Sequence, residues 1–455
     1  MSLLKNKQDN GGGIGRKMLV SSLFMPISTL LSLIYTRVLL QFLGETDYGT
    51  WITISSFAQW VLYFDVGIGN GMRNELAKEI DSGNYESAKR VTSTSYYIIS
   101  IIAIGAFTLF AAATFIIDTD SFFGNSAKTK PIILITSLFT CVNFVLSLCK
   151  SQLYAQQRAE HVGLMNVLVH VLQLFGIYIA SLIFEGNIIA VAIITGLSSV
   201  IIYALFSSLL WRKNAYCRPE RSYVDMQYSK RISTLGIRFF ILQIGCLVIY
   251  STDNLIITSL FGSDKVTSYN MVYKVFNLVL VAFSAFISPV WSNITVETNR
   301  KNFEYIQKIA QKLSLLVLPI CVGLFILTLI FQDLSNWWLG KELHYEKSLI
   351  FSMAIFIALN IYSSIYSAIL NGMGELNVQL FVSVFVALLN IPLSIYLSTS
   401  CEMGITGVIV ASNICMVIST LTVVLQSNFV LKKLLKARNR ELMGETNEGT
   451  NHSKG

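Results

Sequence analysis

Charged residues are scarce in this sequence. Only 13% of its 455 residues are Asp, Glu, Lys or Arg, about half of the roughly 25% found in soluble domains. Hydrophobic residues make up 53% of the chain. A chain with so little charge cannot cover its apolar surface with polar groups in water. The composition therefore excludes an ordinary soluble domain and indicates a membrane protein.

The sequence also lacks the patterns of other membrane and secreted classes. Barrel strands alternate apolar and polar residues over about ten positions, and stretches such as YYIISIIAIGAFTLFAAATFII do not alternate. The hydrophilic start MSLLKNKQDNGGGIGRK precedes an apolar run without a small-residue cleavage site, so we expect a retained span and no signal peptide. Of seven cysteines, only Cys401 falls in a predicted outer loop, which argues against a disulfide framework.

The sequence contains many long apolar runs. A helix needs about 20 predominantly apolar residues to cross roughly 30 Å of hydrocarbon. We therefore predict an all-α polytopic membrane protein with twelve transmembrane helices. The twelve runs lie at 18–43, 48–65, 92–117, 131–154, 162–184, 188–211, 235–261, 266–290, 309–331, 348–370, 377–398 and 404–430.

The distribution of Lys and Arg sets the predicted orientation, because cytoplasmic loops of multi-pass proteins are enriched in these residues. With the N-terminus inside, 26 of the 34 Lys and Arg residues fall in cytoplasmic segments, five in outer loops and three within spans. We expect both termini to be cytoplasmic. We expect the net charge of +8 to face anionic lipid and not nucleic acid.

The sequence contains an internal duplication. Several motifs of the first half recur in the second half, each the same number of residues further along the chain. NYE at 84–86 maps onto NFE at 302–304, and Gly44 maps onto Gly262. Six spans per half give the halves one orientation, so the axis that relates them should run along the membrane normal, as in parallel-repeat transporters. We predict two six-helix lobes and a basic, polar cytoplasmic tail, with the boundaries 1–213, 214–431 and 432–455.

Polar stripes follow several predicted spans. On the second span Trp51, Ser55 and Gln59 recur at four-residue spacing, which places them on one helical face. Such a face must be covered, either by hydrogen bonds within a lobe or by a hydrated cavity. Its repetition at the same offset favours a cavity that both lobes share. On the eighth span the polar positions are Asn270, Tyr273, Lys274 and Asn277. The first span carries Ser32, Tyr35 and Thr36, and the seventh carries the matching set Tyr250, Asp253 and Asn254.

Four ionisable residues fall inside predicted spans, where a charge costs about 2.5–3.5 kcal/mol at the bilayer centre. They are Arg37, Arg238, Asp253 and Lys274. At about 1.5 Å per residue, all but Arg238 lie roughly 10 to 12 Å below the outer surface. Either Asp253 and Lys274 form a salt bridge, or Arg37 and Lys274 attract an anionic ligand while Asp253 tunes the site. Arg238 lies near the cytoplasmic end of its span and is expected to reach the interface.

The stretch FDVGIGNGMRN, at 64–74, resembles a nucleotide-binding loop at first sight. Such a loop needs a preceding strand, and these glycines follow a membrane helix, so the nucleotide interpretation fails. We predict that Gly67, Gly69 and Gly71 release the chain from the helix in left-handed geometry, with Asp65 beside them, as a loop or gating motif. A short interfacial helix should follow, with its apolar residues at four-residue spacing.

A family resemblance rests on the first hundred residues. The order LG at 43–44, YGTW at 48–51 and FDVGIGNG at 64–71 resembles the bacterial polysaccharide flippases. These are the O-antigen or repeat-unit translocases of the Wzx type, in the multidrug/oligosaccharidyl-lipid/polysaccharide exporter superfamily. The second half departs from the pattern, because Phe283 and Pro289 stand where the aspartate and the last glycine would repeat.

The resemblance implies a MATE-like fold and a flippase function. The substrate would be an undecaprenyl-pyrophosphate-linked oligosaccharide, moved by alternating access from the cytoplasmic to the periplasmic leaflet of the bacterial inner membrane. Partners would be this lipid-linked oligosaccharide, membrane lipid and other polysaccharide-assembly proteins, without nucleic acid. The expected substrate-binding residues are Arg37, Trp51, Ser55, Gln59, Asp253, Asn254, Asn270, Tyr273, Lys274 and Asn277.

Two alternative functions stay open. A multidrug exporter of the same superfamily would be expected to place carboxylates in its cavity, whereas this chain places two cations and one carboxylate there. A membrane-bound polymerase or ligase needs a sizeable outer loop, and the longest one is no more than the stretch QDLSNWWLGKELHYEK. We expect a transporter and no enzyme, with no catalytic residue, metal or cofactor.

Overall fold

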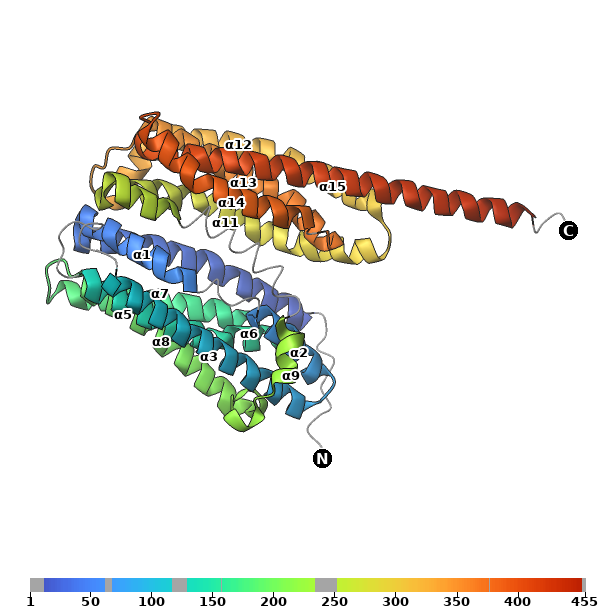
Figure 1. The fold of residues 1–455 in the computed structure, drawn as a ribbon, viewed down its shortest axis with the longest axis horizontal. Coiled ribbons are helices and arrows are strands. Elements are labelled where there is room, and N and C mark those ends of the chain that lie inside the picture. Colours follow the sequence, from blue (N-terminus) through green and yellow to red (C-terminus); the bar gives the residue numbers. More distant parts are fainter. Residues whose placement is uncertain are drawn as a thin grey trace. The chain divides into compact units, whose positions relative to one another are not determined.

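The computed structural model describes residues 12–61, 68–116, 129–156, 158–233, 252–375 and 377–451. All regular secondary structure in these residues is helical, as predicted (Figure 1). The described chain forms two compact units. The first unit comprises the described residues up to 233 together with 258–267, and the second comprises 252–257 and 268–451. The predicted boundary after residue 213 and the axis between the halves stay predictions.

The first unit is a helical bundle in which α1 packs on α7, α3 on α5, and α5 on α8 (Figure 1). Its helices are α1 (Gly12–Ala58), α2 (Ile68–Asp81), α3 (Tyr85–Ile116), α5 (Thr129–Leu146), α6 (Leu148–Ala155), α7 (Ala159–Ser181), α8 (Ile188–Lys213) and α9 (Met226–Ser233). Residues 252–261 are also helical.

The remaining helices belong mainly to the second unit, where α13 and α14 both pack on α15 (Figure 1). They are α11 (Ser263–Asn299), α12 (Phe303–Leu339), α13 (Lys347–Met373), α14 (Asn377–Thr399) and α15 (Gly404–Asn451). The last of these continues as one helix into the predicted tail.

The multi-pass prediction is confirmed. Ten helices among the described residues are long and apolar enough to cross a membrane. Helix α1 accounts for the first two predicted spans, because it is interrupted at Gly44, where φ is 78° and ψ is 178°. Only glycine adopts this conformation at little cost. The seventh predicted span, 235–261, lies mostly outside the described residues.

The helix boundaries repeat the offset found in the sequence. The shift that carries NYE at 84–86 onto NFE at 302–304 also carries both ends of α7 onto the ends of α14. The same shift carries the start of α5 onto the start of α13, and the end of α6 onto the end of α13. One difference interrupts the repeat, because the first copy breaks between Leu146 and Leu148 where α13 is continuous. The helical frame of these segments therefore repeats as the sequence does.

Two equivalent helix starts cross within the first unit. The Thr267 hydroxyl donates to the Glu45 carbonyl oxygen at 2.6 Å. A Cβ at Gly49 would overlap the Ser263 carbonyl oxygen. The sequence offset carries Glu45 onto Ser263 and Gly49 onto Thr267. The two contacts are thus reciprocal.

Helix α2 confirms the predicted amphipathic helix but packs differently. Met72 and Leu76 are fully buried in a cluster with residues of α3 and α6, so the apolar face covers protein. Gly69 and Gly71, which the motif predicts in a loop, lie in the first turn of α2, outside the left-handed region. A residue in the first turn of a helix keeps its helical dihedrals whether or not it is glycine. The loop prediction is therefore wrong for these two glycines.

The linker after α8 packs on the first unit. The Lys89 ammonium lies 2.8 Å from the Glu220 carboxylate, and the Gln152 amide donates to the Cys217 carbonyl oxygen at 2.7 Å. Asp225 accepts from Arg90 at 3.4 Å. Burial raises the pKa of the Cys217 thiol to about 12.

Candidate functional site

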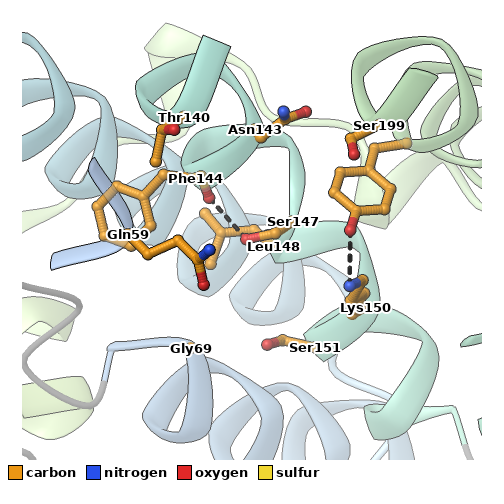
Figure 2. A pocket seen from close by; sticks show the side chains of 11 residues that line it. Gln59, Gly69, Thr140, Asn143, Phe144, Ser147, Leu148, Lys150, Ser151 and Ser199 are labelled. Carbon is orange, nitrogen blue, oxygen red and sulfur yellow. Dashed lines mark hydrogen bonds between the residues drawn. The ribbon is translucent and has the colours of Figure 1, made fainter. Parts of the chain in front are cut away.

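A polar cavity of about 540 Å³ lies inside the first unit (Figure 2). Its wall is built by the end of the second predicted span, the start of α2, the break between α5 and α6, and one face of α8. The polar lining residues are Gln59, Thr140, Asn143, Ser147, Lys150, Ser151, Ser199 and Tyr203. Figure 2 shows the labelled lining residues on different helices around the cavity.

A smaller cavity of about 110 Å³ continues the same lining. The two cavities share Gln59, Thr140, Asn143 and Ser199. The smaller one adds Trp51 and Ser55, so the polar face of the second span lines a cavity within the first unit. A cavity that both lobes share stays a prediction. The role of these residues toward substrate stays a prediction.

The polar face of α5 and α6 was missed in the sequence, although its signal is plain in retrospect. Thr136, Thr140, Asn143, Ser147 and Lys150 recur at alternating four- and three-residue spacing, which places them on one helical face. The predicted membrane orientation uses Lys150 only as one of the basic residues at the cytoplasmic end of its span. A polar stripe running through the whole span is the observation that could have identified this wall of the cavity.

Lys150 and the Tyr203 phenol are the ionisable groups that the described residues bring to this lining. The Lys150 ammonium donates to the Tyr203 hydroxyl at 2.8 Å, the contact drawn as a dashed line in Figure 2. It also stands 4.5 Å from the centre of the same ring. Within the part of the chain that the structure describes, no Asp or Glu lines either cavity. The electrostatic character of the described lining is therefore positive.

Buried atoms without a hydrogen-bond partner among the described residues occur in the lining. They are Ser55 Oγ, Thr136 Oγ1 and Asn143 Oδ1. The Asn143 amide nitrogen donates to the Gly196 carbonyl oxygen at 3.3 Å, which orients the side chain. Buried polar groups are normally paired, and each unpaired one costs about 1–3 kcal/mol. These groups are suited to hydroxyls of a polar ligand.

The predicted site residues of the first span separate into two sets. Tyr35 bonds Thr195 of α8 through its hydroxyl at 2.8 Å, and Thr36 donates to the Ser32 carbonyl oxygen at 2.8 Å. This face thus includes an interhelical hydrogen bond within the unit. Arg37 is exposed on α1, beside the buried Thr36.

The predicted residues of the second unit include a buried carboxyl group. Asp253 is 4% exposed, and the Tyr269 hydroxyl donates to its Oδ2 at 2.5 Å. None of the ion pairs among the described residues includes Asp253. Asn254 and Asn270 are buried nearby in the chain, and Tyr273, Lys274 and Asn277 are half-buried on α11.

The glycine motif is only partly described. Asp65 and Gly67 lie outside the described residues, as does Arg238. Gly69 lines the larger cavity at the start of α2. The structure thus brings Gly69 together with Gln59 and leaves the gating role of the motif a prediction.

Sequence comparisons identify two matching families. The family described as "Polysaccharide biosynthesis protein" matches residues 14–295, and the one described as MatE matches residues 240–396. A protein named "Putative O-antigen export protein", from Yersinia pseudotuberculosis, is 20% identical over 361 residues, which cover 77% of this chain and 81% of the relative.

Structural comparisons show a MATE-like fold. An inward-facing multidrug resistance transporter of the MATE family superimposes with a TM-score of 0.74 at 16% identity, over 92% of this chain and 99% of that one. An outward-facing MATE transporter gives 0.64 at 16% identity, over 92% and 96%. A MOP superfamily transporter from Pyrococcus furiosus, for which reversed polarity of the binding pocket suggests a different function, gives 0.66 at 16% identity, over 92% and 96%.

Proposed function

The chain belongs to the polysaccharide biosynthesis protein family, and from this premise we propose that it is a flippase for a lipid-linked oligosaccharide. Its substrate is an undecaprenyl-pyrophosphate-linked repeat unit, of O-antigen or a related surface polysaccharide. The protein moves this unit from the cytoplasmic to the periplasmic leaflet of the bacterial inner membrane. Both termini lie on the cytoplasmic side.

The observation that carries the proposal is the polar, positive cavity within a membrane-spanning bundle. A phosphorylated sugar asks for cations and hydrogen-bonding groups, which are expensive inside a membrane unless they face protein or water. Lys150 and the hydroxyl and amide groups around it supply both kinds of group. Trp51 supplies an aromatic wall in the smaller cavity.

Substrate transfer then depends on a second cationic level near the outer surface. Arg37 and Lys274 bind the phosphates there, and Asp253 tunes the site. Sugars contact the polar stripes, while the polyprenyl tail stays in lipid. Asp65, Gly67, Gly69 and Gly71 act as a gate at the cytoplasmic exit of the second span. The remaining proposed contacts are Asn254, Asn270, Tyr273 and Asn277 with Ser55 and Gln59.

The test is a strain that lacks this chain and is complemented with variants. Wild-type protein restores surface glycan, and its absence leaves the lipid-linked unit on the cytoplasmic leaflet. Arg37→Ala and Lys274→Ala each impair display while the protein remains inserted at wild-type amount. Undiminished display with either variant removes that residue from the site. Restoration of display without movement of the lipid-linked unit between leaflets refutes the flippase.

The same strain separates the two alternative functions. A multidrug exporter would restore efflux of cationic dyes and would leave glycan display unchanged. A polymerase or ligase would leave unpolymerised units already on the periplasmic leaflet when it is absent. Accumulation on the cytoplasmic leaflet is the outcome that only the flippase predicts.

A further inference from the structure

The polar face of α5 and α6 has an apolar counterpart in the second unit. Helix α13 begins and ends at the positions that correspond to the start of α5 and the end of α6 in the sequence repeat. Each lining residue of α5 and α6 therefore has an equivalent position on α13. Six polar residues of the first copy are Thr136, Thr140, Asn143, Ser147, Lys150 and Ser151. Their counterparts are Ala354, Ala358, Ile361, Ile365, Ala368 and Ile369. Of these, the three isoleucines are fully buried.

This comparison shows that the polar face is not needed to build the bundle. A helix in the equivalent frame packs in the second unit with alanine and isoleucine at all six sites. Polar groups inside a membrane protein cost free energy unless they are hydrogen-bonded. Their presence in one copy alone therefore indicates a function other than packing.

Unpaired atoms in the lining indicate the chemistry of the occupant. Thr136 is 7% exposed, and its hydroxyl has no hydrogen-bond partner within the described chain. The Asn143 Oδ1 atom is also buried without a hydrogen-bond partner, and as a carbonyl oxygen it can only accept a hydrogen bond. Asn143 lines both cavities, whereas Thr136 lines only the smaller one, so a ligand hydroxyl in the larger cavity pairs with the Asn143 oxygen.

The charge of the lining adds an anionic group to this ligand. Lys150 carries three N–H donors, and its described hydrogen bond uses one of them, to Tyr203. The volume of about 540 Å³ falls in the range of about 300–1,000 Å³ that small-molecule sites occupy.

We infer that this cavity is the loading subsite for the phosphate-bearing head of the lipid-linked saccharide, an inference that rests on the proposed function. Lys150 binds a phosphate oxygen, and Asn143 with Thr140 binds the adjoining sugar. In the predicted topology Gln59 and Gly69 flank the cytoplasmic exit of the second span, so the subsite serves the leaflet on which the substrate is made. Arg37 and Lys274, near the opposite surface in that topology, receive the head later.

The test measures binding of undecaprenyl pyrophosphate to the full-length protein in nanodiscs. Undecaprenol, which has the tail without the phosphates, is the matched ligand. Lys150→Gln weakens binding of the pyrophosphate form about tenfold, and Lys150→Arg restores most of it. Lys213→Gln, at an exposed lysine at the end of α8 outside the cavity, leaves binding unchanged. Inorganic pyrophosphate competes with the lipid in wild-type protein.

The outcomes separate the subsite from the flippase itself. Equal binding of the pyrophosphate form by wild type and Lys150→Gln overturns the subsite, while glycan display by the wild type keeps the flippase. Failure of inorganic pyrophosphate to compete also overturns it, because the tail would then be the recognised part. A wild type that binds neither lipid and restores no glycan display refutes the proposed function.

Discussion

The two halves of this protein use one helical frame for different interiors. In the first half, the face of α5 and α6 carries Asn143 and Lys150 and opens on a cavity. In the second half, the same face of α13 carries Ile361 and Ala368, and both are buried. The comparison teaches that the helical frame can repeat while the chemistry of one face changes completely.

Buried and half-buried polar groups form interhelical hydrogen bonds in both units. In the second unit several pair with one another, as Asp253 does with Tyr269 and Asn390 with Ser412. The latter bond, from the Asn390 amide to the Ser412 hydroxyl, measures 3.0 Å. In the first unit, hydroxyl and amide groups line a cavity. The first unit thus combines interhelical hydrogen bonds, such as the one between Tyr35 and Thr195, with polar groups that line a cavity.

The largest effect is expected when residues of the first half are replaced by their counterparts in the second half. The double variant Asn143→Ile, Lys150→Ala removes the charge and the amide from the cavity. A hydrogen bond to a charged group contributes about 1.5–3 kcal/mol, so we expect glycan display to fall about tenfold or more. Display is measured at matched protein amount, with Lys213→Gln as the control. Wild-type display by the double variant would contradict a role of this face in transport.

The reverse exchange tests stability. Ile361→Asn places an amide in a fully buried apolar contact, and an unpaired buried polar group costs about 1–3 kcal/mol in addition to the lost apolar burial. We expect a lower melting temperature of the solubilised protein. The equivalent exchange in the first half, Asn143→Ile, should lower it less, because it removes the hydrogen bond to Gly196 but also removes the unpaired Oδ1 atom. Equal melting of both variants and the wild type would show that the two faces are interchangeable.

The reciprocal crossing offers a third test. Gly49 lies against the Ser263 carbonyl oxygen, whereas its counterpart is Thr267. Gly49→Ala forces the backbones apart, and overpacking of this kind costs about 1–3 kcal/mol. Thermal unfolding should detect the loss. Gly105→Ala is the control, because a Cβ there meets open space. Unchanged stability of Gly49→Ala would mean that the crossing adapts freely.

A smaller effect is expected at Tyr269, whose first-half counterpart is Trp51. Tyr269→Phe deletes the hydroxyl that donates to the Asp253 carboxyl group. The net loss of one hydrogen bond is about 1 kcal/mol, which a modest fall in melting temperature would report. Tyr178→Phe, at a tyrosine that is 61% exposed, should leave the melting temperature unchanged. A shift of the same size in both variants would argue against a special role of the buried pair.

The smallest effect concerns the linker after α8, whose place in the second half is taken by the helical tail. Burial raises the pKa of Cys217 to about 12, whereas an ordinary thiol titrates near 8.5. The unfolded chain therefore loses this proton first, and the thiol's contribution to stability falls as pH rises from about 8.5 to 12. Maleimide at pH 8 should label the exposed Cys401 and leave Cys217 unlabelled until the protein is denatured. Labelling of both in the folded protein would show that the linker is undocked.

Several features were predictable because they are local and periodic. Apolar runs predicted the long helices, and the offset between NYE at 84–86 and NFE at 302–304 predicted the repeated frame. The four-residue spacing of Trp51, Ser55 and Gln59 predicted a shared face, which lines a cavity. The glycines of the FDVGIGNG motif wrongly suggested a loop. Whether a glycine lies in a loop or in the first turn of a helix depends on backbone hydrogen bonds, which the residue type alone does not reveal.

The cavity itself needed contacts between distant segments. The stripe on α5 and α6 is visible in the sequence, but its partner Tyr203 lies 53 residues beyond Lys150. No spacing rule places two helices side by side in a bundle. Likewise, the Asp253 carboxyl group accepts a hydrogen bond from Tyr269, whereas the sequence suggested Lys274 as its partner.

The sequence by itself determined that this chain crosses a membrane many times in two repeated halves, because hydrophobicity and periodicity act along a single helix. Only the tertiary structure decided which polar faces meet a cavity and which meet each other. That choice depends on how neighbouring helices rotate and pack, and a one-dimensional pattern does not contain that rotation.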